Sequence, residues 1–208
     1  MLADTPIAYW RLGETSGTVA ADSSGSHLDG TFVHVTLGVA GALAGDTDKA
    51  ARFNGSNGVV EVSNDSVLRL NGSWTIEFWA RQISFMNAKP GILGKGTGGN
   101  KNTYSVFADS GGQLWLQRNN KLVGSGPGAL AAGYKQFTVT YDGTRVRWYV
   151  NGVLATNSLI TYPSSSGNGQ KLQIGAAQDA GDNDIDEVAL YPSALSAARI
   201  AAHYAAGS

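Results

Sequence analysis

Short stretches in which apolar and polar residues alternate recur along this 208-residue chain. Successive side chains of a strand point to opposite faces of a sheet, so this alternation predicts strands that bury one face against a core. Turn-forming pairs such as Asn54-Gly55, Asn71-Gly72, Asp142-Gly143 and Asn151-Gly152 separate the stretches. The predicted strands are residues 73–83, 104–108, 113–118, 136–142, 144–150, 172–175 and 185–191.

One segment near the C-terminus has a helical pattern instead. In residues 193–204, Leu195, Ile200 and Tyr204 recur at roughly helical spacing, and Ser196 is a candidate N-cap. The pattern therefore predicts an all-β fold with a short C-terminal helix. An all-β sandwich of this length commonly forms one unit, so residues 1–208 are predicted to be a single domain.

Composition supports the all-β prediction and narrows the function. Glycine supplies 28 residues and only 15% of residues are charged, which suits many short strands joined by tight turns. The net charge is −1 and Lys and Arg do not cluster, so nucleic acid is not an expected partner. Without cysteine there is no disulfide and no thiolate metal site. No apolar run is long enough to insert into a membrane.

The N-terminus lacks the basic and apolar regions of a signal peptide. We therefore expect either a piece of a larger exported protein or a route out of the cell that needs no signal.

An acidic run enters the last predicted strand, with the sequence Asp182-Asn183-Asp184-Ile185-Asp186-Glu187. In a strand, the three aspartates share one face and Glu187 lies on the other. The pattern predicts one strongly negative face that needs a cation.

Eight motifs follow one another in a fixed order along almost the whole chain. They are Tyr9-Trp10-Arg11-Leu12-Gly13-Glu14, Ala21-Asp22-Ser23-Ser24-Gly25, Ala50-Ala51-Arg52-Phe53-Asn54-Gly55, Trp74-Thr75-Ile76-Glu77-Phe78-Trp79, Thr138-Val139-Thr140-Tyr141-Asp142-Gly143, Tyr149-Val150-Asn151-Gly152-Val153-Leu154, Ile174-Gly175 and Ile185-Asp186-Glu187-Val188-Ala189-Leu190-Tyr191. In this order they resemble the laminin-G-like, or concanavalin A-like, jelly-roll modules of bacterial and phage surface proteins. The resemblance implies a jelly-roll sandwich of two curved antiparallel sheets that acts as a binding module, commonly with one structural Ca²⁺.

The resemblance also implies where the calcium lies. Asp22 and Asp186 match the family's two carboxylate positions, and the His27 loop and the Asn54-Gly55 turn would add carbonyl oxygens. In the alternative, Asp22 forms an Asx-turn and Asp186 bonds to nearby backbone. The chain departs from the family at Asp182-Asn183-Asp184, where an aromatic residue and a glycine are usual. The three histidines stand singly and show no HxxxH or HExxH spacing, so zinc is not expected.

Strand parity suggests a ligand-binding surface. Trp79, Trp115 and Tyr149 each alternate with core residues and are flanked by polar side chains, the combination that sugar recognition uses. If their strands adjoin, the three rings form one platform. The alternative is that the rings pack under loops or against the C-terminal helix. The polar candidates on the same faces are Glu77, Arg81, Gln113, Gln117 and Arg147.

Catalysis receives less support. Laminarinase-type glucanases share the jelly roll and carry a Glu-x-Asp-x-x-Glu strand that presents two carboxylates. The acidic run has that spacing, with Asp first, but lies near the C-terminus rather than on a central strand. Glu77, on a candidate central strand, has no acidic partner two or four residues away. We therefore expect no enzymatic activity and no catalytic residues.

The prediction is a non-catalytic, calcium-stabilised module that binds carbohydrate on a cell surface or glycoconjugate. The main alternative is a structural or adhesive protein of an assembly, such as a phage virion decoration or tail protein with protein neighbours. A glucanase-like hydrolase is the second alternative. The expected location is extracellular, at a cell surface or on a virion.

Overall fold

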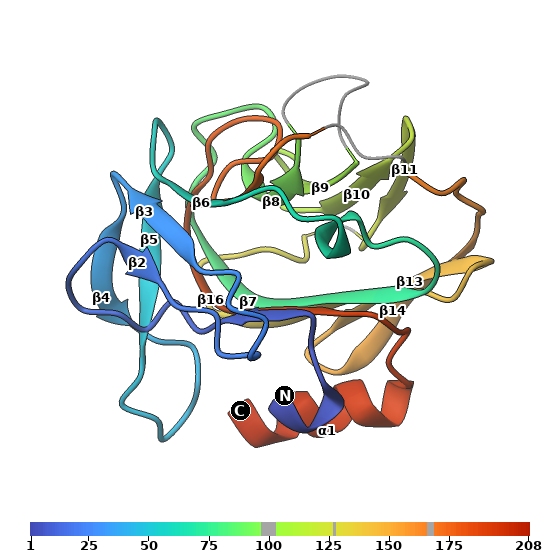
Figure 1. The fold of residues 1–208 in the computed structure, drawn as a ribbon, viewed down its shortest axis with the longest axis horizontal. Helices are drawn as coiled ribbons and strands as arrows, with labels where there is room; N and C mark the ends of the chain where they lie inside the picture. The colour runs from blue at the N-terminus through green and yellow to red at the C-terminus, as the bar shows by residue number, and fades with distance from the viewer. Residues whose placement is uncertain (97–102, 127, 166–168) are drawn as a thin grey trace.

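Two antiparallel β-sheets face each other in the computed structural model, which describes residues 1–96, 103–126, 128–165 and 169–208. Figure 1 shows sheet B above sheet A, and the C-terminal helix α1 (Ala197–Gly207) below sheet A. Sheet A is therefore the middle layer. This architecture confirms the predicted concanavalin A-like jelly-roll sandwich with one short C-terminal helix.

Sheet A has the order β14-β13-β12-β7-β16-β5-β4, with β1 paired to part of β16. Its strands are β1 (Ala8–Trp10), β4 (Thr36–Ala40), β5 (Lys49–Asn54), β7 (Trp74–Ser84), β12 (Lys135–Tyr141), β13 (Arg145–Val150), β14 (Val153–Leu159) and β16 (Asp182–Tyr191). The two longest strands, β7 and β16, lie side by side at its centre.

Sheet B has the order β11-β10-β9-β8-β15-β6-β3-β2. Its strands are β2 (Val19–Ala20), β3 (Gly30–Val33), β6 (Val59–Val62), β8 (Gly91–Lys95), β9 (Tyr104–Ala108), β10 (Leu114–Arg118), β11 (Lys121–Gly124) and β15 (Leu172–Ile174). Two 3₁₀ turns, η1 (Leu2–Asp4) and η2 (Val67–Arg69), complete the elements.

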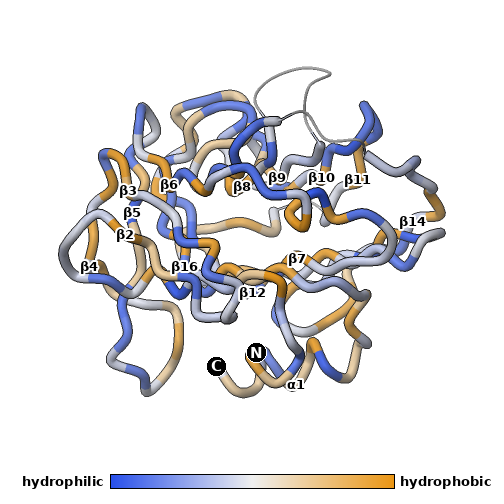
Figure 2. Tube along the Cα trace, in the orientation of Figure 1, coloured by the Kyte–Doolittle hydropathy of each residue, from blue (hydrophilic) through white to orange (hydrophobic). Residues whose placement is uncertain are grey.

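The hydrophobic core lies between the sheets and forms one cluster that both sheets contribute to. Trp10, Trp74 and Trp148 are among its largest side chains and are fully buried. In Figure 2, apolar residues follow strands such as β7, while polar residues prevail in the loops at the top of the view. Burial of apolar area between the sheets is the main stabilising term for such a fold.

All seven predicted strands exist, with bounds that differ by at most three residues. The helix is confirmed too: Ser196 has extended backbone angles and its side chain accepts a hydrogen bond from the Arg199 N–H. The pattern missed nine strands of the described structure, which are β1 to β6, β8, β11 and β14. One of them, the edge strand β14, is mostly exposed, so its residues carry no alternation of buried and exposed positions to detect.

The outer face of sheet A is covered by α1 and by the N-terminal segment. Tyr204 of α1 stacks on Trp79 of β7, with ring centroids 5.8 Å apart. Leu195 precedes the helix and packs with Tyr9, Ala189 and Tyr191 in a second apolar cluster. Most residues of β7 and β16 are consequently buried on both faces.

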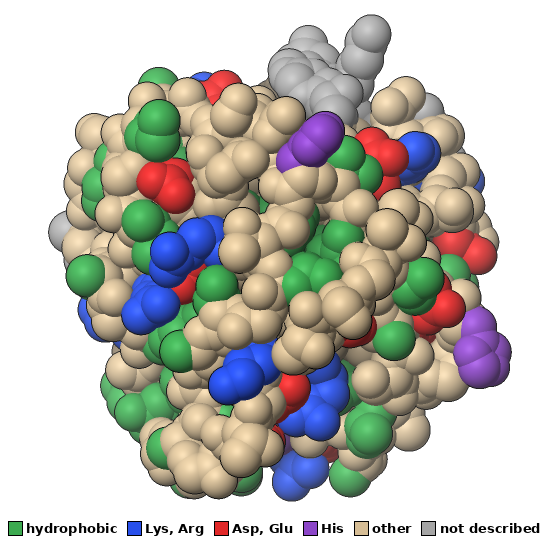
Figure 3. All heavy atoms as spheres, turned by 90° about the vertical axis from the view of Figure 1, so that its left-hand side faces the viewer, with side chains coloured by type: hydrophobic (Ala, Val, Ile, Leu, Met, Phe, Trp, Pro, Cys, Tyr) green, Lys and Arg blue, Asp and Glu red, His purple; other side chains and the backbone are tan. Residues whose placement is uncertain are grey.

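Surface charge is mixed on the face shown in Figure 3, where basic and acidic side chains lie interspersed. Lys, Arg, Asp and Glu thus form no single-sign surface over this side of the sandwich. Among the residues with described positions, no helix has the length and apolar character needed to cross a membrane.

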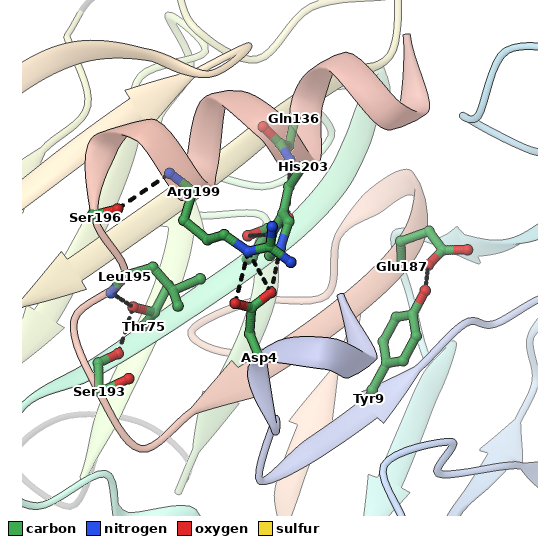
Figure 4. Close-up of polar contacts among 11 residues, drawn as sticks. Asp4, Tyr9, Thr75, Gln136, Glu187, Ser193, Leu195, Ser196, Arg199 and His203 are labelled. Atoms are coloured by element: carbon green, nitrogen blue, oxygen red, sulfur yellow. Dashed lines mark hydrogen bonds and ion pairs between the residues drawn. The ribbon is translucent and has the colours of Figure 1, made fainter.

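A partly buried chain of charged groups joins both termini to sheet A (Figure 4). His203 of α1 contacts the Glu77 carboxylate through Nδ1 at 3.1 Å and the Asp4 carboxylate through Nε2 at 2.8 Å. Arg199 donates to both Asp4 oxygens, at 2.7 and 2.8 Å. Gln136 of β12 donates to Glu77 at 2.9 Å.

These contacts shift proton affinities in opposite directions. Burial opposes protonation of His203, but the hydrogen bonds and charges of Glu77 and Asp4 outweigh it and raise the His203 pKa. The hydrogen bond from Arg199, followed by the hydrogen bond and charge of His203, lowers the Asp4 pKa to about 2 against the opposing effect of burial. A protonated His203 donates one N–H to each carboxylate, which fixes α1 and η1 on the sheet.

We predict that this link makes stability pH-dependent. Since the folded pKa of His203 is raised, its stabilisation is complete below the unfolded pKa and is lost as pH rises through the folded pKa. His203→Gln should lower the melting temperature at pH 6. It should also reduce the fall in melting temperature that the wild type shows between pH 6 and pH 9. Circular dichroism melts across this range measure both.

The matched control is His27→Asn at an exposed position of left-handed backbone, which Asn tolerates. It should preserve the wild-type pH profile. Parallel wild-type and His203→Gln profiles would show that His203 does not carry the effect.

Candidate ligand-binding face

The eight predicted ligand residues are divided between the two sheets. Sheet A carries Glu77, Trp79, Arg81, Arg147 and Tyr149, and the β10 segment of sheet B carries Gln113, Trp115 and Gln117. The two groups lie on outer faces that point in opposite directions. The prediction of one platform built from Trp79, Trp115 and Tyr149 is therefore wrong, because strand alternation does not reveal which sheet a strand joins.

Trp79 and Glu77 do lie on the polar face of β7, as parity predicted, but neither is available to a large ligand. Trp79 is 5% exposed, and a Cβ added at Gly207 would lie 3.0 Å from its ring. Glu77 is fully buried against His203 and Gln136. Both placements correct the ligand-binding prediction and match its stated alternative, packing against the C-terminal helix.

The other sheet A candidates are also engaged within the chain. Arg81 donates to Asp184 at 2.8 Å and lies over the Tyr134 ring. Arg147 donates to Asp142 at 2.6 Å. Tyr149 is only 4% exposed. These contacts leave the outer face of sheet A poorly suited to a large ligand.

The outer face of sheet B presents the remaining predicted residues together. In β10, Leu114 and Leu116 are buried and Trp115 and Gln117 are partly exposed, as predicted from their alternation. Trp115 lies opposite Phe107 of β9 and Gly124 of β11. Directly opposite residues share a face, so the two aromatic rings lie on one surface.

Trp115 is held in a defined orientation. Its indole Nε1–H donates to Asp109 at 3.0 Å. A Cβ at position 124 would collide with the Gln113 amide and approach the Trp115 ring to 3.3 Å. Glycine at 124 thus leaves room for both side chains to lie across the sheet.

A row of amide and hydroxyl groups runs beside the aromatic pair. Gln117 lies opposite Ser105 of β9, which lies opposite Gly94 of β8. Gln178 lies in the loop after β15 and donates to Gln117 at 2.6 Å and to Ser105 at 3.1 Å. Strand parity did not identify Gln178, because its loop reaches this face only in the folded chain.

The row continues across the sheet. Gln173 of β15 lies opposite Gly94 on one side and Glu61 of β6 on the other. Lys171 pairs with Glu61 at 2.6 Å, and Lys89 lies near the Phe107 ring. We define the outer face of sheet B around Phe107, Gln113, Trp115, Gln117 and Gln178 as the Trp115 face.

The acidic run of β16 is neutralised by protein groups rather than left as one charged surface. Asp184 is fully buried and receives hydrogen bonds from Arg52 at 2.6 and 2.9 Å in addition to the bond from Arg81. Asp182 bonds to Ser84. The cation that the Asp182–Asp184–Asp186 pattern called for is therefore supplied at Asp184 by two arginines.

The next two carboxylates lie at a bulge in β16, where Glu187 has left-handed backbone angles. Glu187 accepts hydrogen bonds from Tyr9 and Arg11. Asp186 accepts one from the Ala42 N–H at 2.8 Å through Oδ2, while its buried Oδ1 has no protein partner among the described residues. Burial raises the pKa of both groups to about 7.

Two of the four predicted calcium ligands, Asp22 and Asn54, use their side-chain oxygens in hydrogen bonds within the protein. Both Asp22 oxygens accept hydrogen bonds, including those from the N–H groups of Tyr9, Ser24 and Leu28. Asn54 Oδ1 accepts three backbone N–H groups of its own turn. The Asn54 oxygen has no capacity left for a metal, so only its backbone carbonyl fits the prediction.

The other two predicted calcium ligands, His27 and Asp186, differ in burial. His27 is exposed on left-handed backbone. Asp186 has a free, buried carboxylate oxygen. Within the described part of the chain, no group of three His, Asp or Glu side chains is arranged to hold a metal. Of the predicted set, Asp186 is the side chain that fits a cation.

Known proteins share this fold. A model of the family described as the concanavalin A-like lectin/glucanases superfamily matches residues 54–201. Curated protein sequences give no match. The binding domain of botulinum neurotoxin DC in complex with SialylT superposes with a TM-score of 0.73 at 15% identity, over 100% of this chain and 53% of that chain.

Two other structures show the same similarity. The neurotoxin binding domain in complex with rat synaptotagmin II gives a TM-score of 0.71 at 17% identity, over 100% of this chain and 53% of that one. Trypanosoma rangeli sialidase in complex with 2,3-difluorosialic acid gives 0.72 at 13% identity, over 96% of this chain and 33% of that chain. This chain thus spans a third to about half of those chains. By its family match, its two-sheet topology and the residues that carried the resemblance, it belongs to the concanavalin A-like lectin/glucanases superfamily.

Proposed function

We propose that this chain is a non-catalytic recognition module that binds carbohydrate through the Trp115 face. The observation that carries the proposal is the partly exposed Trp115 ring, oriented by Asp109 and bordered by amides on the same outer surface. An indole offers a flat apolar surface to the C–H face of a sugar ring. Amide groups both donate and accept, as hydroxyl recognition requires.

The amide groups of the Trp115 face are held in place before any ligand binds. Gln117 and Gln178 already bond to each other, and Gln178 is also anchored to Ser105. Groups held in place before binding lose less side-chain entropy when a ligand arrives. The neurotoxin binding domain with this fold was solved in complex with SialylT, which supports a glycan as the ligand class. We place the ligand on a cell surface or glycoconjugate, and the module outside the cell, at a cell surface or on a virion.

A glucanase-like function receives less support from the side chains. Retaining hydrolysis needs two carboxylates about 5–5.5 Å apart and accessible to one substrate. Asp184, the second of the three acids with the glucanase-like spacing, is fully buried and accepts hydrogen bonds from two arginines. A cavity of about 560 Å³ between α1 and sheet A is lined by residues that include Tyr9, Trp79 and Glu187. Among the described residues of that lining, Glu187 is the one carboxylate.

A role in a protein assembly is favoured by a separate observation. β14 is the last strand of sheet A, so among the described residues one of its edges pairs with no other strand. Its Val153, Leu154 and Leu159 are 69%, 50% and 74% exposed. Exposed apolar edge strands are surfaces for strand pairing. A stable oligomer in sedimentation velocity that Leu159→Lys dissociates would favour this function over the carbohydrate module.

We also propose that a structural Ca²⁺ binds at Asp186. The support is its buried Oδ1, which lacks a protein partner and would gain from a cation. Calcium takes six to eight oxygens, so backbone carbonyls and waters would complete the shell.

Glycan binding should depend on Trp115. Trp115→Ala should weaken binding to the ligands selected on a glycan array by about 1–3 kcal/mol, roughly 5- to 150-fold in Kd, because the stacking surface is lost. Trp115→Phe should keep part of the affinity. Isothermal titration calorimetry gives the Kd values, and circular dichroism checks the fold.

Arg147→Ala is the control, since Arg147 lies on the outer face of sheet A and bonds to Asp142. It should bind like the wild type. Equal affinity of Trp115→Ala and wild type, or no glycan bound by a folded wild-type protein, would reject the Trp115 face.

Calcium should raise the melting temperature of the wild type relative to chelator, and Asp186→Asn should remove that rise. The physical reason is that the cation neutralises a buried carboxylate in the folded state only. Differential scanning fluorimetry in millimolar Ca²⁺ and in chelator measures the shift.

Asp22→Asn separates the two predicted carboxylates. Since backbone donors occupy Asp22, this variant should lower the melting temperature equally with and without calcium. A wild type that melts at the same temperature in both conditions would reject the calcium proposal. A calcium response lost in Asp22→Asn and kept in Asp186→Asn would move the site.

A further inference from the structure

A buried arginine without a counter-ion lies at one end of the sandwich. Arg118 ends β10 on its core side and is 2% exposed. It donates to the Arg69 carbonyl at 3.2 Å and to Asn71 Oδ1 at 3.3 Å. Its Nε–H has no partner among the described residues. Two of five guanidinium N–H donors are thus used, and both bonds are long.

No carboxylate of this chain compensates the charge. Within the described residues, the Arg118 guanidinium forms no ion pair with Asp or Glu. Residues 97–102, 127 and 166–168 contain no Asp or Glu either. A buried unpaired charge is costly, so an anion from outside the chain would be bound favourably.

The surroundings of Arg118 are aromatic and rich in donors. The guanidinium carbon lies 6.0 Å from the centroid of the Trp74 ring and 5.9 Å from that of Tyr162. The Trp74 indole N–H and the hydroxyls of Tyr104 and Tyr162 are buried without a hydrogen-bond partner in the described structure. Several unused donors therefore gather around one cation.

A cavity of about 150 Å³ opens onto this group. Its lining includes Gly72, Arg118, Tyr141, Gly143, Tyr162 and Ser164. Gly72 and Gly143 belong to turns with left-handed backbone, and a Cβ at either position would meet no atom within 4 Å. Their side of the cavity is therefore open space.

A second buried cation lies on the same side of sheet B. Lys95 is fully buried, lies opposite Tyr104 in the β8–β9 pair, and donates to Asn64 Oδ1 at 2.6 Å. Burial, followed by the charge of Arg69, lowers its pKa, while Asp65 opposes this shift. Two buried cations, Arg118 and Lys95, therefore lie on the core side of sheet B, and neither forms an ion pair within the described residues.

We propose that the Arg118 cavity is an oxyanion site that receives the carboxylate of an acidic monosaccharide. The planar guanidinium matches a carboxylate in a two-point hydrogen bond. The Tyr162 ring and the Ser164 side chain at the lining fit the carbon face and hydroxyls of the attached ring. The sugar part of this inference rests on the proposed function, whereas the oxyanion part stands without it.

Calorimetric titration with glucuronate, glucose and inorganic sulfate tests the site. The wild type should bind glucuronate and not glucose, because only the acid presents a carboxylate to Arg118. Arg118→Met should abolish glucuronate binding, and Arg118→Lys should weaken it at least tenfold, since an ammonium group lacks the guanidinium fork. Tyr162→Phe, which keeps the ring, should weaken binding several-fold and guards against a misfolded Arg118→Met.

Trp115→Ala separates this site from the Trp115 face, because Trp115 points to the opposite side of β10. That variant should retain wild-type affinity for glucuronate even where it loses array ligands. Glucuronate binding that survives both Arg118→Met and Tyr162→Phe would overturn the proposal. Equal binding of glucose and glucuronate would also overturn it. Binding of sulfate alone would overturn the sugar part and support the oxyanion part.

Discussion

Burial of sheet A on both faces is the constraint on which the rest of this structure depends. One face of β7 and β16 packs into the core between the sheets, and α1 with the N-terminal segment covers the other. Apolar packing alone does not specify this cover, since Glu77 lies at its centre. The contacts of His203 with Glu77 and Asp4 satisfy that buried carboxylate and hold both termini in place. Without such partners the charge would oppose burial.

This cover decides where a ligand surface is available. Trp79 and Glu77 have the residue types of a sugar platform, but they are part of the interior of a three-layer arrangement. No helix of the described residues covers the outer face of sheet B, and there Trp115 keeps partial exposure among amides. The same fold thus buries the aromatic residues of β7 and leaves Trp115 of β10 partly exposed, which is why the proposed ligand surface lies on sheet B.

The pairing of β16 with its neighbouring strands also explains how its acidic residues are neutralised. β16 brings Asp184 between Arg52 of β5 and Arg81 of β7, its two neighbours in the sheet. The bulge that follows turns Glu187 toward Tyr9 and Arg11. Among the carboxylates of this run, Asp186 is the one with a buried oxygen that lacks a hydrogen-bond partner in the described structure. The acidic run, which the sequence pattern predicted to form one negative surface, therefore makes separate contacts with different neighbours in the structure.

The sequence by itself determined part of the local structure. Alternation located β7, β9, β10, β12, β13, β15 and β16, Ser196 marked the start of α1, and parity assigned Leu114 and Leu116 to the core. These features depend on neighbouring residues, whose spacing is set by strand and helix geometry.

The tertiary structure alone decided which strands share a sheet and what covers each face. Trp115 and Tyr149 lie in different sheets, Gln178 reaches Gln117 across 61 residues, and Arg118 is buried without an acidic partner. Strand order and helix docking arise from contacts between residues far apart in the chain. Periodicity within a segment carries no information about such contacts, so the candidate face and the Arg118 cavity appear only in the folded molecule.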